Sequence, residues 1–124
     1  MSKLDQNKFM EAQMLNQQLQ HLQQQLHSLD HQLEGLENLK SDLDSLKGQK
    51  DSKTYSSLNG GVFVESEIKE SNSVLLNVGA NVLVKKKKEE ALELIENQLK
   101  ELKQIRVKLE NEVNKLGMHM MSLQ

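Results

Sequence analysis

A repeating pattern of leucines constrains this chain more than any other feature of its sequence. In the first part of the chain, the intervals between leucines alternate between four and three residues, at Leu15, Leu19, Leu22, Leu26, Leu29 and Leu33. This spacing places one apolar stripe along a helix and is typical of coiled coils. It predicts a helix from about Leu4 to Lys47, followed by Gly48, which suits the C-terminal cap of a helix.

The stripe changes in the second half of this predicted helix. One series keeps its seven-residue interval through Leu36 and Leu43, whereas the companion series moves by one residue to Leu39 and Leu46. A straight helix drifts relative to a seven-residue repeat. We therefore expect the packed face to drift here, with leucine at 39 taking the place that the strict repeat gives to Lys40.

A second apolar stripe runs from about residue 88 to residue 123, and its members are Leu92, Ile95, Leu99, Leu102, Leu109, Val113, Leu116, Met120 and Leu123. Arg106 occupies one position of this stripe, and we expect the adjacent Ile105 to substitute for it. Neither helix can bury its stripe alone, so the two should pack against each other. A connection that reverses the chain makes them antiparallel and brings the two chain ends to one tip.

Residues 48–87, between the predicted helices, have a different character. Six of the eight valines lie between Val62 and Val84. Residues 62–64, 74–78 and 82–84 predict short strands, with residues 54–58 as a fourth. The expected turn residues tolerate the positive φ of tight hairpin turns, and they are Gly60, Gly61, Gly79 and Asn81. Two β-hairpins should therefore join the helices, which gives an α+β fold that is mostly α.

These predicted hairpins carry apolar residues that one chain cannot bury. Isolated hairpins are marginally stable in water, and exposed strand edges pair with other chains. We therefore expect this part of the chain to oligomerise. The residues predicted to do so are Val62, Phe63, Val64, Val74, Leu76, Val78, Val82 and Val84.

Composition and charge argue against several classes of function. The chain has no cysteine, so a disulfide scaffold and a thiolate metal site are ruled out. Its net charge of −2 argues against nucleic acid as the main partner. No apolar run approaches the ~20 residues of a membrane span, and the first residues lack the apolar core of a signal peptide.

Catalytic chemistry is equally hard to find in the sequence. His27 and His31 are spaced four residues apart, as two metal ligands on a helix can be, but Asp30 lies off their shared face. We interpret these histidines as part of a solvated helix face. There is no glycine-rich phosphate loop, and the carboxylates are scattered along polar faces. We therefore expect no enzyme activity, no metal and no cofactor.

All six methionines lie near the two ends of the chain, at positions 1, 10, 14, 118, 120 and 121. Extending the stripes places Met120 on the seam but leaves the pairs Met10–Met14 and Met118–Met121 beside it. Methionine is common on surfaces that bind varied apolar partners. We predict such a surface at the tip, made of Phe9, Met10, Met14, Met118, Met120, Met121 and Leu123. The alternative is that these residues merely fill a frayed helix end.

The order of helix, two hairpins and helix resembles the α-type subunit of prefoldin over essentially the whole chain. The residues that carry the resemblance are Leu58-Asn59-Gly60-Gly61-Val62-Phe63-Val64, Val74-Leu75-Leu76-Asn77-Val78-Gly79-Ala80-Asn81-Val82-Leu83-Val84 and Glu89-Glu90-Ala91. The resemblance implies a single subunit over residues 1–124, with helices at 1–47 and 88–124. It implies a cytoplasmic hexamer of two such subunits and four β-type prefoldin subunits, whose hairpins form β-barrels. It also implies that the tips hold unfolded client proteins and pass them to a group II chaperonin without ATP.

Two features leave alternatives open. The run Lys85-Lys86-Lys87-Lys88 could bind nucleic acid or an acidic chaperonin surface, but we favour a solvated strand end whose charge discourages unwanted edge pairing. The whole chain could also be a structural protein that polymerises into a filament through its hairpins, with the coiled coils as spacers. Exposed methionines at the tip favour the chaperone hypothesis, because a spacer has no use for them.

Overall fold

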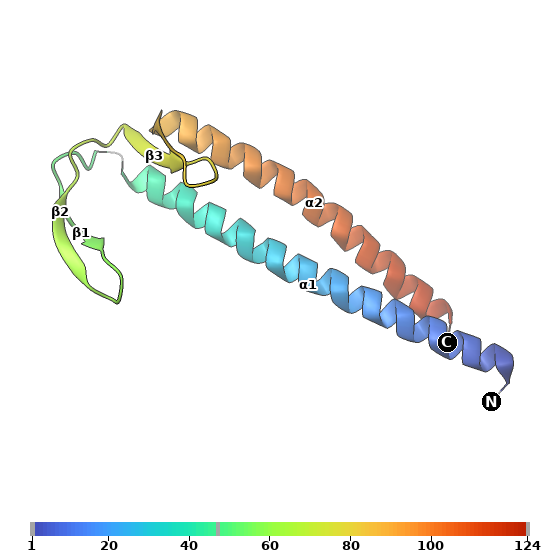
Figure 1. Ribbon diagram of the computed structural model, residues 1–124. Helices are drawn as coiled ribbons and strands as arrows, with labels where there is room; N and C mark the ends of the chain where they lie inside the picture. The colour runs from blue at the N-terminus through green and yellow to red at the C-terminus, as the bar shows by residue number, and fades with distance from the viewer. Residues whose placement is uncertain (1, 47, 124) are drawn as a thin grey trace. The chain divides into compact units, whose positions relative to one another are not determined.

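The computed structural model describes residues 2–46 and 48–123, and these residues form two long helices and four strands (Figure 1). In chain order the elements are α1 (Lys3–Ser45), β1 (Lys53–Ser57), β2 (Phe63–Glu67), β3 (Ser73–Asn77), β4 (Leu83–Lys87) and α2 (Lys88–Ser122). The helices run antiparallel and the strands form two hairpins between them. The predicted fold class is therefore confirmed. Positions 1 and 47, which the predicted first helix included, lie outside the described residues, as does 124.

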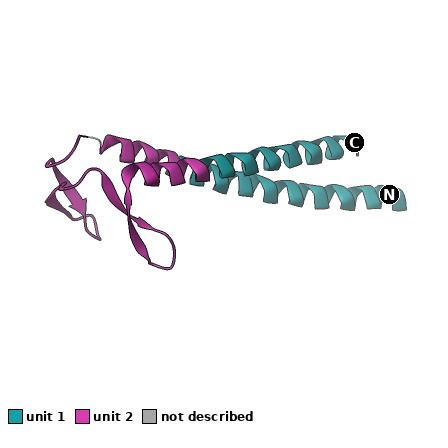
Figure 2. Ribbon diagram, turned by 90° about the horizontal axis from the view of Figure 1, so that it is seen from above, with its two compact units in different colours: residues 1–35, 99–124 teal, residues 36–98 magenta. Residues whose placement is uncertain are grey.

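The chain consists of two compact units (Figure 2). Unit 1 contains residues 1–35 and 99–124, which are the N-terminal part of α1 and the C-terminal part of α2. Unit 2 contains residues 36–98, which are the remainder of both helices and the two hairpins. Each unit contains one segment of α1 antiparallel to one segment of α2, so each has a seam of its own.

In unit 1, the two leucine stripes form the contact between the helices, as predicted. Leu15 and Leu29 of α1 and Leu99 of α2 are buried. The other stripe residues are half-buried, and they are Leu19, Leu22, Leu26, Leu33, Leu102, Leu109, Val113, Leu116, Met120 and Leu123. Two helices without a third layer cannot fully enclose the side chains between them, which explains the partial burial. At the start of α1, the Ser2 hydroxyl accepts a hydrogen bond from the Asp5 N–H at 3.1 Å and caps the helix.

In unit 2, the expected drift of the α1 stripe does not occur at position 39, although Leu46, its second expected member, is half-buried. Leu39 is 41% exposed, whereas Lys40 is half-buried and its Nζ lies 3.5 Å from the Glu96 carboxylate of α2. Leu43 is buried, so the strict seven-residue repeat continues through position 40. A lysine can occupy a seam position because its aliphatic stem packs while its ammonium group reaches a carboxylate at the rim. Across the seam, Ala91 and Ile95 are buried.

The first hairpin pairs β1 with β2 in antiparallel register, from Lys53 opposite Glu67 to Ser57 opposite Phe63. The strands extend further toward the helices than the predicted ranges did. Val62 lies outside β2, and its carbonyl accepts a hydrogen bond from the Leu58 N–H at 2.7 Å. Gly60 and Gly61 have φ values of 81° and 80°. These two predicted turn residues therefore do adopt the left-handed backbone that favours glycine.

The second hairpin is built in the same way. It pairs β3 with β4, from Ser73 opposite Lys87 to Asn77 opposite Leu83. Val78 and Val82 lie outside the strands and close the turn, with the Val78 N–H donating to the Val82 carbonyl at 3.0 Å. The three residues between them all have positive φ, namely Gly79, Ala80 and Asn81. Glycine and asparagine were expected in this conformation, but the alanine was not.

The helices connect to the strands through short turns. Gly48 has a φ of 76° and lies in a turn closed by the Gln49 N–H, which donates to the Leu46 carbonyl at 3.1 Å. It follows the end of α1 at Ser45 by three residues, so it is a turn residue rather than the immediate helix cap. At the other side, α2 follows β4 without a linker. The Lys88 N–H donates to the Asn72 carbonyl at 2.8 Å, which ties the start of α2 to the connection between the hairpins.

Candidate functional surfaces

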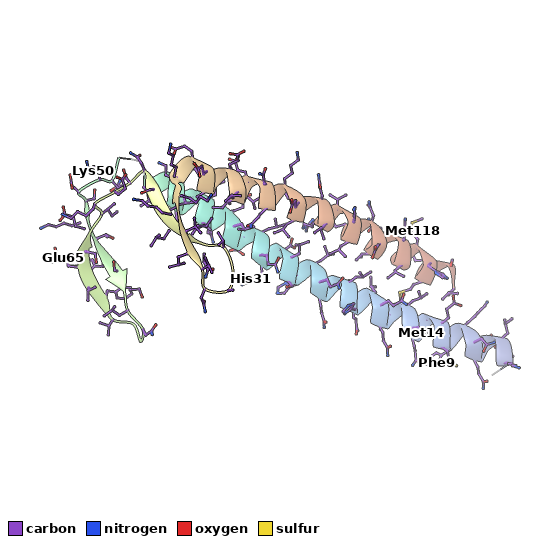
Figure 3. The ribbon with its side chains drawn as sticks, turned by 45° about the horizontal axis from the view of Figure 1, so that its top comes forward. Phe9, Met14, His31, Lys50, Glu65 and Met118 are labelled. Carbon is purple, nitrogen blue, oxygen red and sulfur yellow. The ribbon has the colours of Figure 1, made fainter. Side chains whose placement is uncertain are left out.

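The end of unit 1 that carries both chain ends exposes a group of large apolar side chains. Met10 and Met14 of α1 are 60% and 61% exposed, and Met118 and Met121 of α2 are both 71% exposed. Phe9 is also exposed. Figure 3 shows Met14 and Met118 pointing away from each other, out of the helix pair. We call this group, with Phe9, the apolar tip.

One contact shows how the two helices are aligned at the apolar tip. The Nε2 atom of His119 on α2 lies 3.2 Å from a Glu11 carboxylate oxygen on α1. From this level α1 continues back to Lys3, whereas α2 continues only to Ser122. The start of α1 therefore extends beyond the end of α2. Leu4 lies on this extension and is exposed, and the sequence analysis missed it because it precedes the leucine stripe.

The sequence-predicted tip residues fall into two groups. Phe9, Met10, Met14, Met118 and Met121 are exposed, whereas Met120 and Leu123 are half-buried. The half-buried pair continues the seam, and the exposed residues flank it. In the rest of unit 1, among the described residues, the large apolar side chains that are exposed are Ile105 and Val107. Exposed apolar surface in this unit is thus concentrated at one end.

A groove of about 400 Å³ opens between the helices further along unit 1. It is lined by Gln18, His21 and Leu22 of α1 and by Glu112, Lys115 and Leu116 of α2. The two leucines are seam residues and are half-buried. The seam is therefore open to solvent at this point, although a leucine from each helix occupies it.

Polar side chains bridge the middle of the unit 1 seam. Arg106 is half-buried at its stripe position, and its guanidinium donates to both carboxylate oxygens of Asp30, at 2.5 Å from Nε to Oδ1 and 3.3 Å from Nη2 to Oδ2. It also donates to the Glu110 carboxylate. Ile105 remains exposed. The expectation that Ile105 would substitute for Arg106 was therefore wrong, because the arginine stays in the seam and finds an acidic partner across it.

The ion pair between Asp30 and Arg106 shifts the pKa values of both residues. The hydrogen bond from Arg106 holds the pKa of Asp30 below its ordinary value, and the nearby positive charge acts in the same direction. In return, the hydrogen bond to Asp30 raises the pKa of Arg106. Both groups are therefore charged over the whole neutral range. Such a pair can position one helix relative to the other.

The hairpin registers show which strand residues share a face. On the second hairpin one face carries five apolar residues and Lys86. The apolar residues are Val74, Leu76, Val78, Val82 and Val84. All five were predicted as oligomerisation residues. On the first hairpin, Val62 and Val64 share a face with Leu58, whereas Phe63 lies on the opposite face beside Tyr55. The predicted residues therefore occupy both faces of the first hairpin.

Several exposed hairpin residues were not predicted. Tyr55, Leu58, Leu75 and Leu83 are exposed apolar side chains in addition to the predicted set. On the second hairpin the prediction selected the alternating positions 74, 76, 78, 82 and 84, so it left out Leu75 and Leu83 between them. The strand register could have found these residues, because Leu75 and Leu83 lie on the second hairpin face that the valines do not occupy.

We also searched the described residues for a metal site and for a membrane-spanning helix. Residues 2–46 and 48–123 contain no group of three or more His, Asp or Glu side chains placed to hold a metal ion. None of the helices formed by these residues is both long and apolar enough to cross a membrane.

The geometry defines a coiled-coil protein with an antiparallel helix pair, two open-edged hairpins and an apolar tip. The family model described as Prefoldin subunit matches residues 15–124, and the chain therefore belongs to the prefoldin family. The resemblance that the sequence carries is thus confirmed. Subunits of this family are non-enzymatic chaperone components, in agreement with the expectation of no enzyme activity.

Two individual proteins illustrate the similarity. Prefoldin subunit alpha of Thermofilum pendens is 34% identical over 59 residues, and the match spans about half of each protein, 48% of this chain and 46% of that one. A chain from the cryo-EM structure of filamentous PFD from Methanocaldococcus jannaschii has a TM-score of 0.79 at 25% identity. That comparison covers 90% of this chain and 93% of the other.

Proposed function

We propose that this chain is a subunit of a cytoplasmic, ATP-independent chaperone that binds unfolded proteins at its apolar tip and passes them to a group II chaperonin. The observation that carries the proposal is the apolar tip itself. Four methionines and a phenylalanine are exposed at one end of unit 1, on helices whose remaining outer surface is mostly polar. Exposed apolar groups of this kind normally mark an interaction surface.

The chemistry of the apolar tip suits a client without a fixed structure. Methionine is unbranched and polarizable, so its side chain adapts to different apolar partners. Many weak contacts can then cover the apolar segments of an unfolded chain without selecting one sequence. Binding the unfolded chain lowers its free concentration and so opposes its aggregation.

Assembly would strengthen this weak binding. We propose that the hairpins pair with a second copy of this chain and with four β-type prefoldin subunits to complete β-barrels. The exposed apolar residues on both hairpins support this role, because a free chain leaves them in water. Several tips held in one assembly add avidity that a single tip lacks.

The proposal is tested by suppression of aggregation of a chemically unfolded protein. We expect the assembled complex to protect the client. Protection should fall at least about fivefold when this subunit carries M10S, M14S, M118S and M121S. The matched control carries I105S and V107S, which remove exposed apolar side chains from the same unit away from the tip. Sizing must show that both variants assemble normally.

The outcomes separate the possible client surfaces. Loss of protection in the tip variant but not in the control supports the proposal. Unchanged protection in the tip variant contradicts the proposed role of the methionines and points to the open seam at Leu22 and Leu116 or to the other subunits. Complete absence of protection by the wild-type complex would contradict the chaperone role as a whole.

A filament is the second candidate function. The specific observation in its favour is the similarity to a chain of filamentous PFD, together with the free strand edges of both hairpins. Mixing with a β-type partner and then sizing distinguishes the two. A closed complex of fixed size supports the chaperone subunit, whereas a series of long polymers supports a filament.

A further inference from the structure

The two hairpins have the same construction but opposite charge. Each has two five-residue strands, and each closes its turn with a hydrogen-bonded apolar pair, Leu58–Val62 in the first and Val78–Val82 in the second. Position by position, β2 therefore corresponds to β4. Where β2 has Phe63, Glu65 and Glu67, β4 has Leu83, Lys85 and Lys87.

Alternation along a strand places these residues on one face of each hairpin. Glu65 and Glu67 are exposed and have only surface partners: Lys53 at 3.9 Å and Lys69 at 3.4 Å. Surface ion pairs of this kind contribute little and exchange readily. Lys85 and Lys87 are also exposed, and neither forms an ion pair within residues 2–46 and 48–123. Their neighbour Lys86 points to the other face and pairs with Glu90 at 3.9 Å.

Both strands also have an open edge. Each sheet contains two strands, so β2 and β4 each hydrogen-bond to one neighbour and leave the other edge free. A free edge recruits a further strand through its backbone groups. Side chains on the same face then lie opposite each other, where unlike charges attract and like charges repel. Charge therefore disfavours β2–β2 and β4–β4 pairing and favours β2–β4.

We propose that the open edge of β2 in one copy of this chain pairs with the open edge of β4 in a second copy, with Glu65 opposite Lys85. These two residues are the central members of their strands, so they can meet whether the strands run parallel or antiparallel. The proposal rests on the assembly role of the hairpins proposed above, and it specifies which strand meets which.

Such a contact joins two different surfaces, which has a consequence for assembly. If both β2–β4 contacts form between the same two copies, the result is a closed two-fold dimer. If each copy uses its two hairpins on two different neighbours, the result is an open chain of copies. The same strand pairing therefore serves either of the two assemblies considered for this protein.

Charge reversal tests the pairing in the full-length chain. We expect E65K/E67K and K85E/K87E each to raise the dissociation constant of self-association at least about tenfold, because attraction becomes repulsion. In an equimolar mixture of the two variants, β2 of one variant and β4 of the other carry opposite charges, so the variants should associate with each other. The four-fold variant carrying both reversals should recover the dissociation constant of the wild type. The matched controls, E93K/E101K and K100E/K108E, make the same charge changes on exposed positions of α2. Sedimentation velocity measures the constants, and circular dichroism verifies folding.

Disulfide trapping tests the predicted neighbours directly, because the chain has no cysteine of its own. A mixture of E65C and K85C should form a disulfide-linked heterodimer at least about five times faster than a mixture of E65C and K86C, since Lys86 lies on the other face. Equal rates would overturn the proposal. The proposal would also be overturned if both charge-reversed variants self-associated with the dissociation constant of the wild type. It would be overturned as well if the wild-type chain stayed monomeric at all concentrations. None of these results depends on client protection, so they are distinguishable from a failure of the chaperone function.

Discussion

Asp30 of α1 and Arg106 of α2 bind each other through two hydrogen bonds across the seam of unit 1, although 76 residues separate them in the sequence. A planar guanidinium that contacts both oxygens of a carboxylate accepts little variation in geometry. A shift of one helix along the other by one seam layer would break both bonds. This pair therefore selects one alignment of the two helices.

We predict that Arg106→Leu makes the helix pair more stable but less uniquely aligned. Leucine continues the apolar stripe, and the Asp30 carboxylate that loses its partner is exposed and stays hydrated. The gain in apolar packing should therefore outweigh the loss of a partly exposed ion pair. Thermal unfolding should then occur at a higher temperature. Distances between spin labels on cysteines introduced at Gln25 and Lys108 should change from one narrow distribution to a broad or split one.

Arg106→Lys is the control for this prediction. Lysine keeps the charge but lacks the planar fork that contacts both oxygens. It should broaden the distance distribution without the increase in unfolding temperature. A narrow distribution in both variants would show that the leucines alone set the alignment.

The lowered pKa of Asp30 predicts a pH dependence of stability. A carboxyl group whose pKa is lower in the folded than in the unfolded chain adds stability at pH values above its unfolded pKa, which is about 3.9. That contribution is lost as the pH falls through the lower, folded pKa. The raised pKa of Arg106 keeps this residue charged throughout this range.

The measurement is urea unfolding of the wild type and of Asp30→Asn between pH 6 and pH 2. The wild type should be the more stable at pH 6, and the difference should shrink steadily below about pH 4. If the difference in free energy of unfolding stayed constant down to pH 2, the negative charge of Asp30 would not be its source.

Packing in unit 2 predicts a sharp contrast between two neighbouring residues of α2. Ile95 is 4% exposed in the seam, whereas Leu94 is 43% exposed on the outer side. Ile95→Ala should lower the free energy of unfolding by about 2–4 kcal/mol, because it removes buried methyl groups and leaves a cavity. Leu94→Ala should cost less than about 1 kcal/mol. Urea unfolding of the two variants checks this, and similar costs would contradict the assigned seam.

Two glycines should respond oppositely to alanine. Gly35 lies within α1 with an ordinary helical backbone, and an added methyl group meets no atom within 4 Å. Gly35→Ala should therefore raise the free energy of unfolding by about 0.5–1 kcal/mol. Gly60 has a φ of 81° in the turn of the first hairpin. Gly60→Ala should therefore lower the free energy of unfolding by about 1 kcal/mol. Chemical unfolding of both variants tests the pair, and a loss of stability in the Gly35 variant would indicate an unrecognised contact at that face.

The architecture was predictable because it follows from two strong periodic signals. Leucine spacing located both helices, and the glycine and asparagine turns located both hairpins. The sequence failed where a polar residue occupies an apolar position. Lys40 and Arg106 stay in the seam because Glu96 and Asp30 lie opposite them, and no property of the first helix alone reveals what faces it.

The candidate surfaces were predicted in part. Spacing alone separated the exposed methionines at 118 and 121 from the half-buried one at 120, because helical periodicity assigns them to different faces. Leu4 was missed because it precedes the stripe. The match of Glu65 with Lys85 could not be recognised before the registers were known, because which residues share a hairpin face depends on where each turn closes.

The seam of unit 1 has one further consequence. Most of its layers consist of buried or half-buried apolar side chains, and the Asp30–Arg106 pair sets the alignment at one of them. A repeat of seven residues, inserted into both helices at matching layers, would therefore lengthen each helix by about 10.5 Å without changing any contact above or below it. The reach of such a helix pair is a quantity that evolution or protein engineering can adjust in steps, independently of what the tip binds and of what the hairpins join.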